Sequence, residues 1–180
     1  MQTPSHLVIA AAASKAFSGV PTYSSAFLIG SVAPDVPLYV LSLVGGLYYT
    51  RVKKMTPQAA AELMFSKLFF KHPLWIVAHN LLHSPTLLLL LLVPLWWQES
   101  AAASWLFWFL ASCLLHTLID IPVHHDDGPL LFFPFQWRTR FISPVSYWDR
   151  ARGAGWFMWL EGGVVVALLI YLAWPWLARG

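Results

Sequence analysis

The chain has one cysteine, eight acidic residues and few charges of either sign in its 180 residues. The single cysteine, Cys113, excludes an intramolecular disulfide and says little about the redox compartment. Charged residues make up 11% of the chain and hydrophobic residues 58%. Soluble domains carry about 25% charged residues, so these charges are too few to cover a soluble core. We therefore expect a membrane protein.

The chain also has no concentrated basic face. Its formal net charge is only +3, and its basic residues lie mainly between the apolar segments. This distribution is typical of membrane orientation, so we expect no nucleic-acid partner. The sequence shows no internal repeat and no low-complexity linker, and we expect a single integral membrane domain over residues 1–180.

Three apolar segments are close to the roughly 20 residues that a transmembrane helix needs. They are residues 73–97, 101–123 and 156–177. The N-terminal apolar segments are shorter or are interrupted by proline and glycine, so we expect short or re-entrant helices there. The predicted fold is all-α: a polytopic membrane protein with three transmembrane helices and this N-terminal region.

Basic residues concentrate in two loops. Residues 50–72 carry five of them and residues 124–155 carry four, whereas the 98–100 turn carries only Glu99. The positive-inside rule then places both long loops in the cytoplasm. The start of the 73–97 segment and the end of the 101–123 segment should share that inner face.

Ionisable residues recur near the predicted inner face. His79 and His83 are four residues apart, as are His116 and Asp120. Residues at i and i+4 share one face of a helix, so each pair can present two ligands to one point. Ionisable residues inside an apolar span are costly and mark function by default.

More ligand-type residues lie at the ends of the apolar segments. The run His124-His125-Asp126-Asp127 follows one of them, and His6 and Asp35 belong to the N-terminal region. Imidazole and carboxylate are ligands of zinc, manganese and ferrous iron at hydrolytic centres. We predict a divalent-metal site, with zinc favoured and manganese or iron as alternatives. The expected ligands are His6, Asp35, His79, His83, His116, Asp120 and His124.

Two further roles are expected near this cluster. Four consecutive side chains cannot all point inward, so Asp126 or Asp127 is free to act as a general base or as a further ligand. Arg138 and Arg140 are topology determinants first, and they are also candidates for binding the anionic group of a substrate.

The same residues fit two other classes of protein. In a non-enzymatic subunit of a larger membrane complex, a His/Asp metal cluster would only hold helices together. A transporter or proton relay is less well supported, because residues 101–115 offer few polar side chains through the bilayer.

Several short motifs resemble a known family. They are Thr3-Pro4-Ser5-His6, Gly30-Ser31-Val32-Ala33-Pro34-Asp35, His83-Ser84, His116-Thr117-Leu118-Ile119-Asp120 and Gly128. In this order they resemble the predicted membrane-bound metal-dependent hydrolases of bacterial inner membranes, over residues 3–134. The resemblance implies a metal site made of His6, Asp35, His83, His116 and Asp120.

The chain departs from that family pattern at two points. Pro37 stands where the family usually has a second acid, and the stretch before His83-Ser84 differs in spacing. The His-x-x-x-Asp helix is also similar to that of zinc-dependent phospholipases C, which implies a phosphoester or lipid-like substrate. The expected function is a membrane-embedded metal-dependent hydrolase at the cytoplasmic face of the inner membrane, with membrane lipid as its partner.

Overall fold

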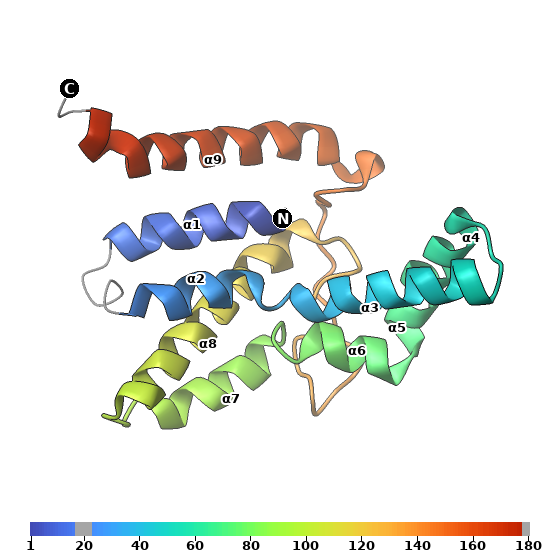
Figure 1. Cartoon of the computed structure of the whole chain (residues 1–180), viewed down its shortest axis with the longest axis horizontal. Helices are drawn as coiled ribbons and strands as arrows, with labels where there is room; N and C mark the ends of the chain where they lie inside the picture. Colours follow the sequence, from blue (N-terminus) through green and yellow to red (C-terminus); the bar gives the residue numbers. More distant parts are fainter. Residues whose placement is uncertain (17–22, 178–180) are drawn as a thin grey trace.

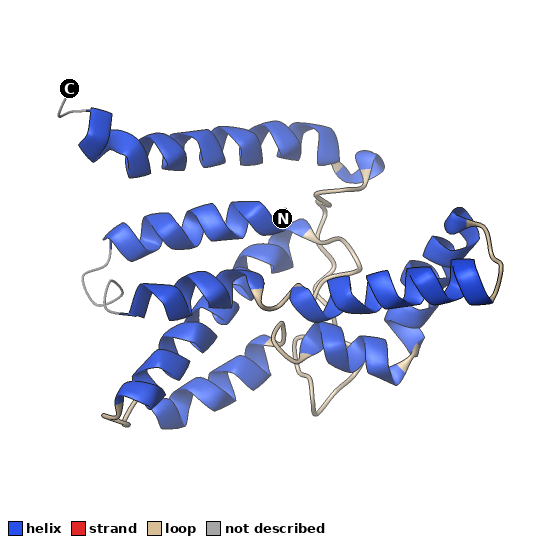
Figure 2. Cartoon of the chain, viewed as in Figure 1, coloured by secondary structure: helices blue, strands red, loops and turns tan. Residues whose placement is uncertain are grey.

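The computed structural model describes residues 1–16 and 23–177. These residues form helices joined by turns and loops, and Figure 2 shows no strand among them. The predicted fold class, an all-α polytopic membrane protein, is confirmed. The helices are α1 (Thr3–Ala16), α2 (Ser24–Val32), α3 (Val36–Leu47), α4 (Pro57–Glu62), α5 (Phe69–Lys71), α6 (Pro73–Asn80), α7 (Pro85–Leu95), α8 (Ala101–Asp120) and α9 (Ala154–Leu177).

The described chain offers two to four membrane spans. Residues Ala101–Val123 and Ala154–Trp176 are each long and apolar enough to cross a bilayer alone. The other candidates are bent pairs: α2 and α3 meet at 41°, and α6 and α7 meet at 47°. The segment 73–97, predicted as one span, therefore consists of two helices.

Local sequence explains both bends. Proline lacks a backbone N–H and disfavours helical geometry in the residue before it, and Pro34 and Pro37 surround the first bend. At the second bend, Ser84 is extended and its hydroxyl accepts a hydrogen bond from the Leu87 N–H at 3.4 Å. Pro85 then starts α7, a position that proline favours. Asp35 and His83 therefore lie in the turns at the two bends, outside regular helix.

Helix α1 packs on α2, α2 on α8 and α8 on α7, and α9 lies along α1 (Figure 1). Buried Ala10 and Phe27 join α1 to α2, with Trp108 of α8 packed against them. Gly30 permits the close approach of α2 to α8, because a Cβ there would overlap the backbone oxygen of Phe109. This approach fixes where α2 ends relative to α8.

A second group of helices lies beyond the two bends (Figure 1). There α3, α6 and the segment from α4 to α5 pack around buried Met64, Phe69 and Trp75. Two π-helical turns, Tyr48–Val52 and Leu63–Leu68, lie in this part of the chain.

The long loop between α8 and α9 is tied to the second bend by three hydrogen bonds. Asn80 Oδ1 accepts from the Leu130 N–H at 2.6 Å. The Ser84 and Thr86 hydroxyls donate to the carbonyls of Phe133 and Leu131 at 2.8 and 2.7 Å. These bonds hold the loop against the bend that carries His83.

Candidate metal centre

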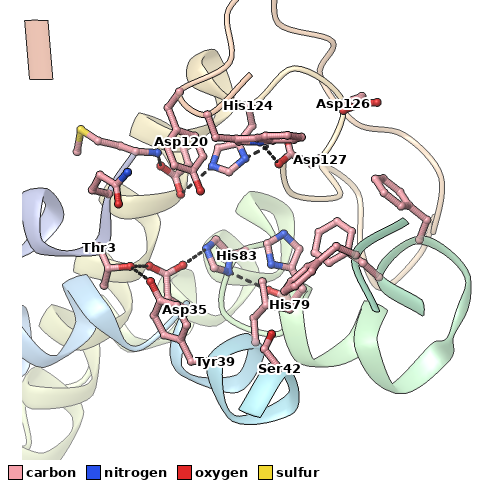
Figure 3. Close-up of a pocket in the computed structure, with 18 of the residues that line it drawn as sticks. Thr3, Asp35, Tyr39, Ser42, His79, His83, Asp120, His124, Asp126 and Asp127 are labelled. Atoms are coloured by element: carbon pink, nitrogen blue, oxygen red, sulfur yellow. Dashed lines mark hydrogen bonds and ion pairs between the residues drawn. The ribbon is translucent and has the colours of Figure 1, made fainter. Parts of the chain in front are cut away.

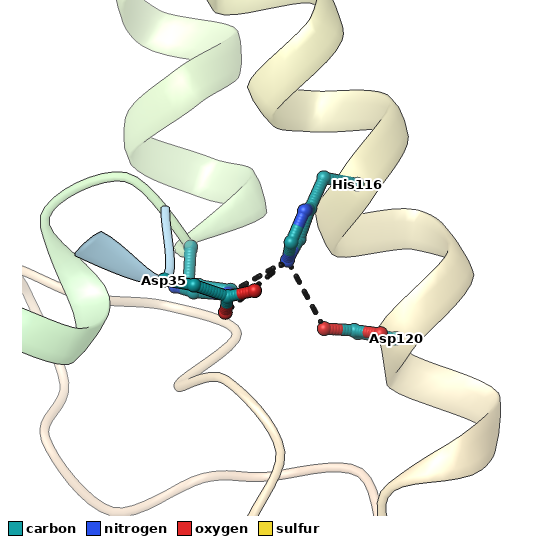
Figure 4. A group of neighbouring side chains, drawn as sticks. Asp35, His116 and Asp120 are labelled. Atoms are coloured by element: carbon teal, nitrogen blue, oxygen red, sulfur yellow. Dashed lines mark hydrogen bonds and ion pairs between the residues drawn. The ribbon is translucent and has the colours of Figure 1, made fainter. Parts of the chain in front are cut away.

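Four side chains from three parts of the chain converge at the end of α8. Asp35 comes from the first bend, His83 from the second, and His116 and Asp120 from α8. One ligand atom of each lies within 4.8 Å of those of the other three. His116 Nε2 is 3.2 Å from Asp120 Oδ2 and 3.6 Å from Asp35 Oδ1 (Figure 4). A group of this kind is able to hold a metal ion.

The two histidines of this group have their tautomers fixed by backbone carbonyls. The His83 Nδ1–H donates to the His79 oxygen at 2.9 Å, and the His116 Nδ1–H donates to the Ser31 oxygen at 2.7 Å. In a neutral ring the proton is then on Nδ1, and Nε2 carries the lone pair. The two Nε2 atoms nevertheless lie 3.1 Å apart. Two lone pairs at this distance repel unless a proton or a cation lies between them.

The two carboxylates are also held from outside the group. The Thr3 hydroxyl donates to Asp35 Oδ2 and is 2.6 Å from the Tyr39 hydroxyl. Asp120 Oδ1 is 3.0 Å from His6 Nε2, and the Met1 amino group donates to the same oxygen at 2.7 Å. Such outer contacts orient ligands and leave the other carboxylate oxygens, Asp35 Oδ1 and Asp120 Oδ2, facing the histidines.

The other three predicted ligands surround this group without belonging to it. The His6 ring stacks on His116 with centroids 3.7 Å apart, and the His79 ring stacks on His83 at 4.5 Å. Both ring nitrogens of His79 are buried without a hydrogen-bond partner among the described residues. His124 Nε2 is 3.6 Å from Asp120 Oδ2. Figure 3 shows His124 beside Asp120 and His79 beside His83.

A cavity of about 680 Å³ opens directly beside the four ligands. Asp35, His83 and Asp120 line it, so the candidate centre is reachable from the cavity. Its volume lies within the range of roughly 300–1,000 Å³ that small-molecule sites occupy. The rest of the lining contains both polar and apolar side chains. The apolar ones include Leu38, Phe65, Phe69 and Phe70.

The run after α8 does not act as a unit, because its side chains diverge. The His125 Nδ1–H donates to the Ser143 oxygen at 2.5 Å. Asp126 is exposed, lines the cavity and lies apart from the other labelled residues in Figure 3. Asp127 also lines the cavity and accepts from the Trp148 indole N–H at 2.8 Å. Its other oxygen is 3.2 Å from His124 Nδ1. His124 and Asp127 thus connect Asp120 to the cavity wall.

Charges stabilise the His124–Asp127 pair. Burial would raise the pKa of Asp127, but the hydrogen bond and charge of His124 and the Trp148 indole lower it below its usual value. Burial would lower the pKa of His124, and its contacts with Asp120 and Asp127 instead raise it. Asp127 is therefore ionised at neutral pH.

The two predicted substrate-binding arginines lie in different surroundings. Arg138 is exposed and does not line the cavity. The Arg140 guanidinium lies 5.3 and 5.5 Å from the ring centroids of Phe69 and Phe70, both of which line it. Arg140 also donates to the Gly128 oxygen. Only Arg140 adjoins the cavity wall.

Sequence reasoning missed three contributors to this arrangement. Thr3 holds Asp35, the Ser31 carbonyl holds His116, and fully buried Asn80 anchors the loop that carries Asp127. The role of Asn80 was predictable in part, because a buried amide in an apolar helix needs a hydrogen-bond partner. The role of a backbone carbonyl such as that of Ser31 cannot be predicted from the residue type, because every residue has one.

The fold and site define a polytopic helical membrane protein with a buried His/Asp group beside a cavity. The chain belongs to the family of the YdjM inner membrane protein, whose sequence model matches residues 1–179. It is therefore a protein of the bacterial inner membrane. Neither the curated proteins nor the solved structures gave a significant match.

Proposed function

We propose that this protein is a membrane-embedded, metal-dependent hydrolase that acts on a phosphoester or lipid-like ester at the cytoplasmic face. The proposal rests mainly on the two Nε2 atoms that face each other at 3.1 Å, beside two carboxylates and a cavity. Two neutral imidazoles and two carboxylates carry a net charge of −2, of which the Met1 amino group at Asp120 offsets one unit, and a cation among the four ligands would supply the remaining positive charge. Burial without such a cation is expensive.

Asp35, His83, His116 and Asp120 would hold the ion. It would act as a Lewis acid on a phosphoryl or acyl oxygen and activate water. Zinc is favoured because imidazole nitrogen and carboxylate oxygen are its ligands, with manganese or iron as alternatives. His6, His79 and His124 would orient the four ligands through stacking and through the contacts with Asp120.

Asp127 is the side chain that we assign as general base. It is ionised, lines the cavity and is held by Trp148 and His124. In the hydrolytic step, the water oxygen forms a bond to phosphorus and one water proton passes to the Asp127 carboxylate. The bond from phosphorus to the leaving oxygen breaks, and that oxygen takes up a proton from solvent. Arg140 contributes positive charge near the substrate anion.

One observation favours the alternative of a non-enzymatic subunit of a larger membrane complex. Four protein ligands can fill a tetrahedral zinc shell, as structural sites do. The cavity favours the enzyme, because a structural site needs no open space beside its ligands.

The test is hydrolysis of bis(p-nitrophenyl) phosphate and p-nitrophenyl acetate by the detergent-purified protein, with and without added Zn²⁺ or Mn²⁺. Metal-dependent turnover that is lost in Asp35→Asn is the expected result. A tightly bound stoichiometric metal with no turnover of either ester would favour the structural site.

A further inference from the structure

The cavity is amphipathic, and its two kinds of lining come from different parts of the fold. The ligands come from the bends and α8, whereas the apolar lining comes from α3 and residues 65–70. Figure 1 shows α3 and α5 beyond the bends, away from α1, α2 and α8. The space therefore has a charged end and an aromatic end.

The charged end lies at the end of α8 that is predicted to face the cytoplasm. α8 has 20 residues and so rises roughly 30 Å from Ala101 to Asp120. This length is about the thickness of the hydrocarbon core. The ligand atoms of Asp35 and His83 lie within 4.8 Å of those of His116 and Asp120, so all four share this level. A substrate would therefore present its ester near the inner surface of the membrane.

The aromatic lining differs from an ordinary core. Phe65 and Phe70 remain 46% and 38% exposed although they belong to the cavity wall. Phe69 is buried, with the Arg140 guanidinium 5.3 Å from its ring centroid and the His79 ring centroid 4.9 Å away at a tilt of 54°. An alkyl chain in the cavity would cover Phe65 and Phe70, and burial of each methylene is worth about 0.8 kcal/mol. The Arg140 guanidinium lies beside Phe69 and Phe70 and adds a positive charge next to this wall.

We infer that the substrate is a lipid phosphoester whose phosphoryl group lies at Asp35, His83, His116 and Asp120 and whose chain lies along Leu38, Phe65 and Phe70. For the chemistry at the phosphoryl group, this inference rests on the proposed function. It adds that the apolar wall is a chain-binding surface that selects membrane lipids over water-soluble esters.

The first experiment compares two substrates with one leaving group, ethyl p-nitrophenyl phosphate and dodecyl p-nitrophenyl phosphate. The zinc-loaded protein in detergent should show kcat/KM at least about tenfold higher for the dodecyl ester. Phe65→Ser should reduce this preference several-fold, and Phe65→Leu should keep it. Phe135→Ser is the matched control, because Phe135 is 75% exposed and does not line the cavity. Partition of the dodecyl ester into micelles is the same for every variant.

The second experiment needs no turnover. A benzophenone photocrosslinker at position 65 should form adducts with membrane lipid, and added dodecyl p-nitrophenyl phosphate should reduce them. Adducts from position 135 should not change. If neither ester is hydrolysed but the dodecyl ester still reduces the adducts at position 65, the proposed function is wrong and the chain-binding wall is supported. Equal kcat/KM for both esters, or equal effects of Phe65→Ser and Phe135→Ser, would overturn the inference while the hydrolase stands.

Discussion

His83 and His116 face each other through their Nε2 atoms at 3.1 Å, while a backbone carbonyl accepts the Nδ1 proton of each. Neither neutral ring has a proton to place between them. Asp35 Oδ1 lies 3.5 Å from one Nε2 and 3.6 Å from the other. Ligands that point at each other in this way are arranged for a positive charge in the middle.

The first prediction concerns that charge. The purified protein should contain about one divalent metal ion per chain by elemental analysis, and His116→Ala should lose it, because one of four donors and the Ser31 contact disappear. The thermal unfolding temperature of the loaded wild type should fall on chelation. His72→Ala is the control, since His72 is exposed and outside the group. Equal metal content in both variants would remove His116 from the ligand set.

The second prediction concerns topology. The loops at 50–72 and 124–155 should both be cytoplasmic, because nine of the basic residues lie there. In a Cys113→Ala background, Gln58→Cys and Arg138→Cys should react with a membrane-impermeant maleimide only after the inner face is opened. Glu99→Cys should react from outside. Labelling of positions 58 and 138 from opposite faces would contradict the predicted orientation.

The i,i+4 pair in α8 was predictable because its helix is continuous. His116 and Asp120 share one face, and Nε2 and Oδ2 meet at 3.2 Å. The equal spacing of His79 and His83 gave a poorer prediction. α6 ends at Asn80, so the two rings stack on each other and only His83 points into the group. Periodicity locates ligands only as far as the helix extends.

Bends and loops set the limit of what the sequence predicts. Pro34 indicated an interrupted helix, but not that Asp35 would meet residues 48 or more positions away. In the run after α8, neighbours in sequence point to different partners: His125 to Ser143, and Asp127 to Trp148. Those directions depend on where the loop is tied by Asn80, which lies 50 residues before Leu130.

The third prediction concerns the close contact of α2 with α8. Gly30→Ala should lower the free energy of unfolding by about 1–3 kcal/mol, because the added methyl group must displace the Phe109 backbone. It should also weaken metal affinity, since the neighbouring Ser31 carbonyl orients His116. Thermal unfolding in detergent and competition with a chelator measure the two effects.

Gly163→Ala in α9 is the matched control, because nothing lies within 4 Å of a Cβ there and alanine favours the helix. It should leave metal affinity unchanged and stability unchanged or slightly higher. Similar losses of stability in both variants would show that Gly30→Ala does not act through the close contact of α2 with α8.

The last prediction separates the two neighbouring carboxylates of the loop. Both carboxylates line the cavity, but only Asp127 is held by the Trp148 indole and His124, whereas Asp126 is exposed and lies apart (Figure 3). Asp127→Asn keeps the size of the side chain but cannot accept a proton, so kcat for p-nitrophenyl phosphoesters should fall by about 10²–10⁴ with metal content unchanged. Asp126→Asn should retain activity within about twofold, because a surface charge loses little when neutralised. A large loss in Asp126→Asn with an active Asp127→Asn would move the general base to position 126. Loss of metal in Asp127→Asn would instead make Asp127 part of the support for the ligands, acting through His124 and Asp120.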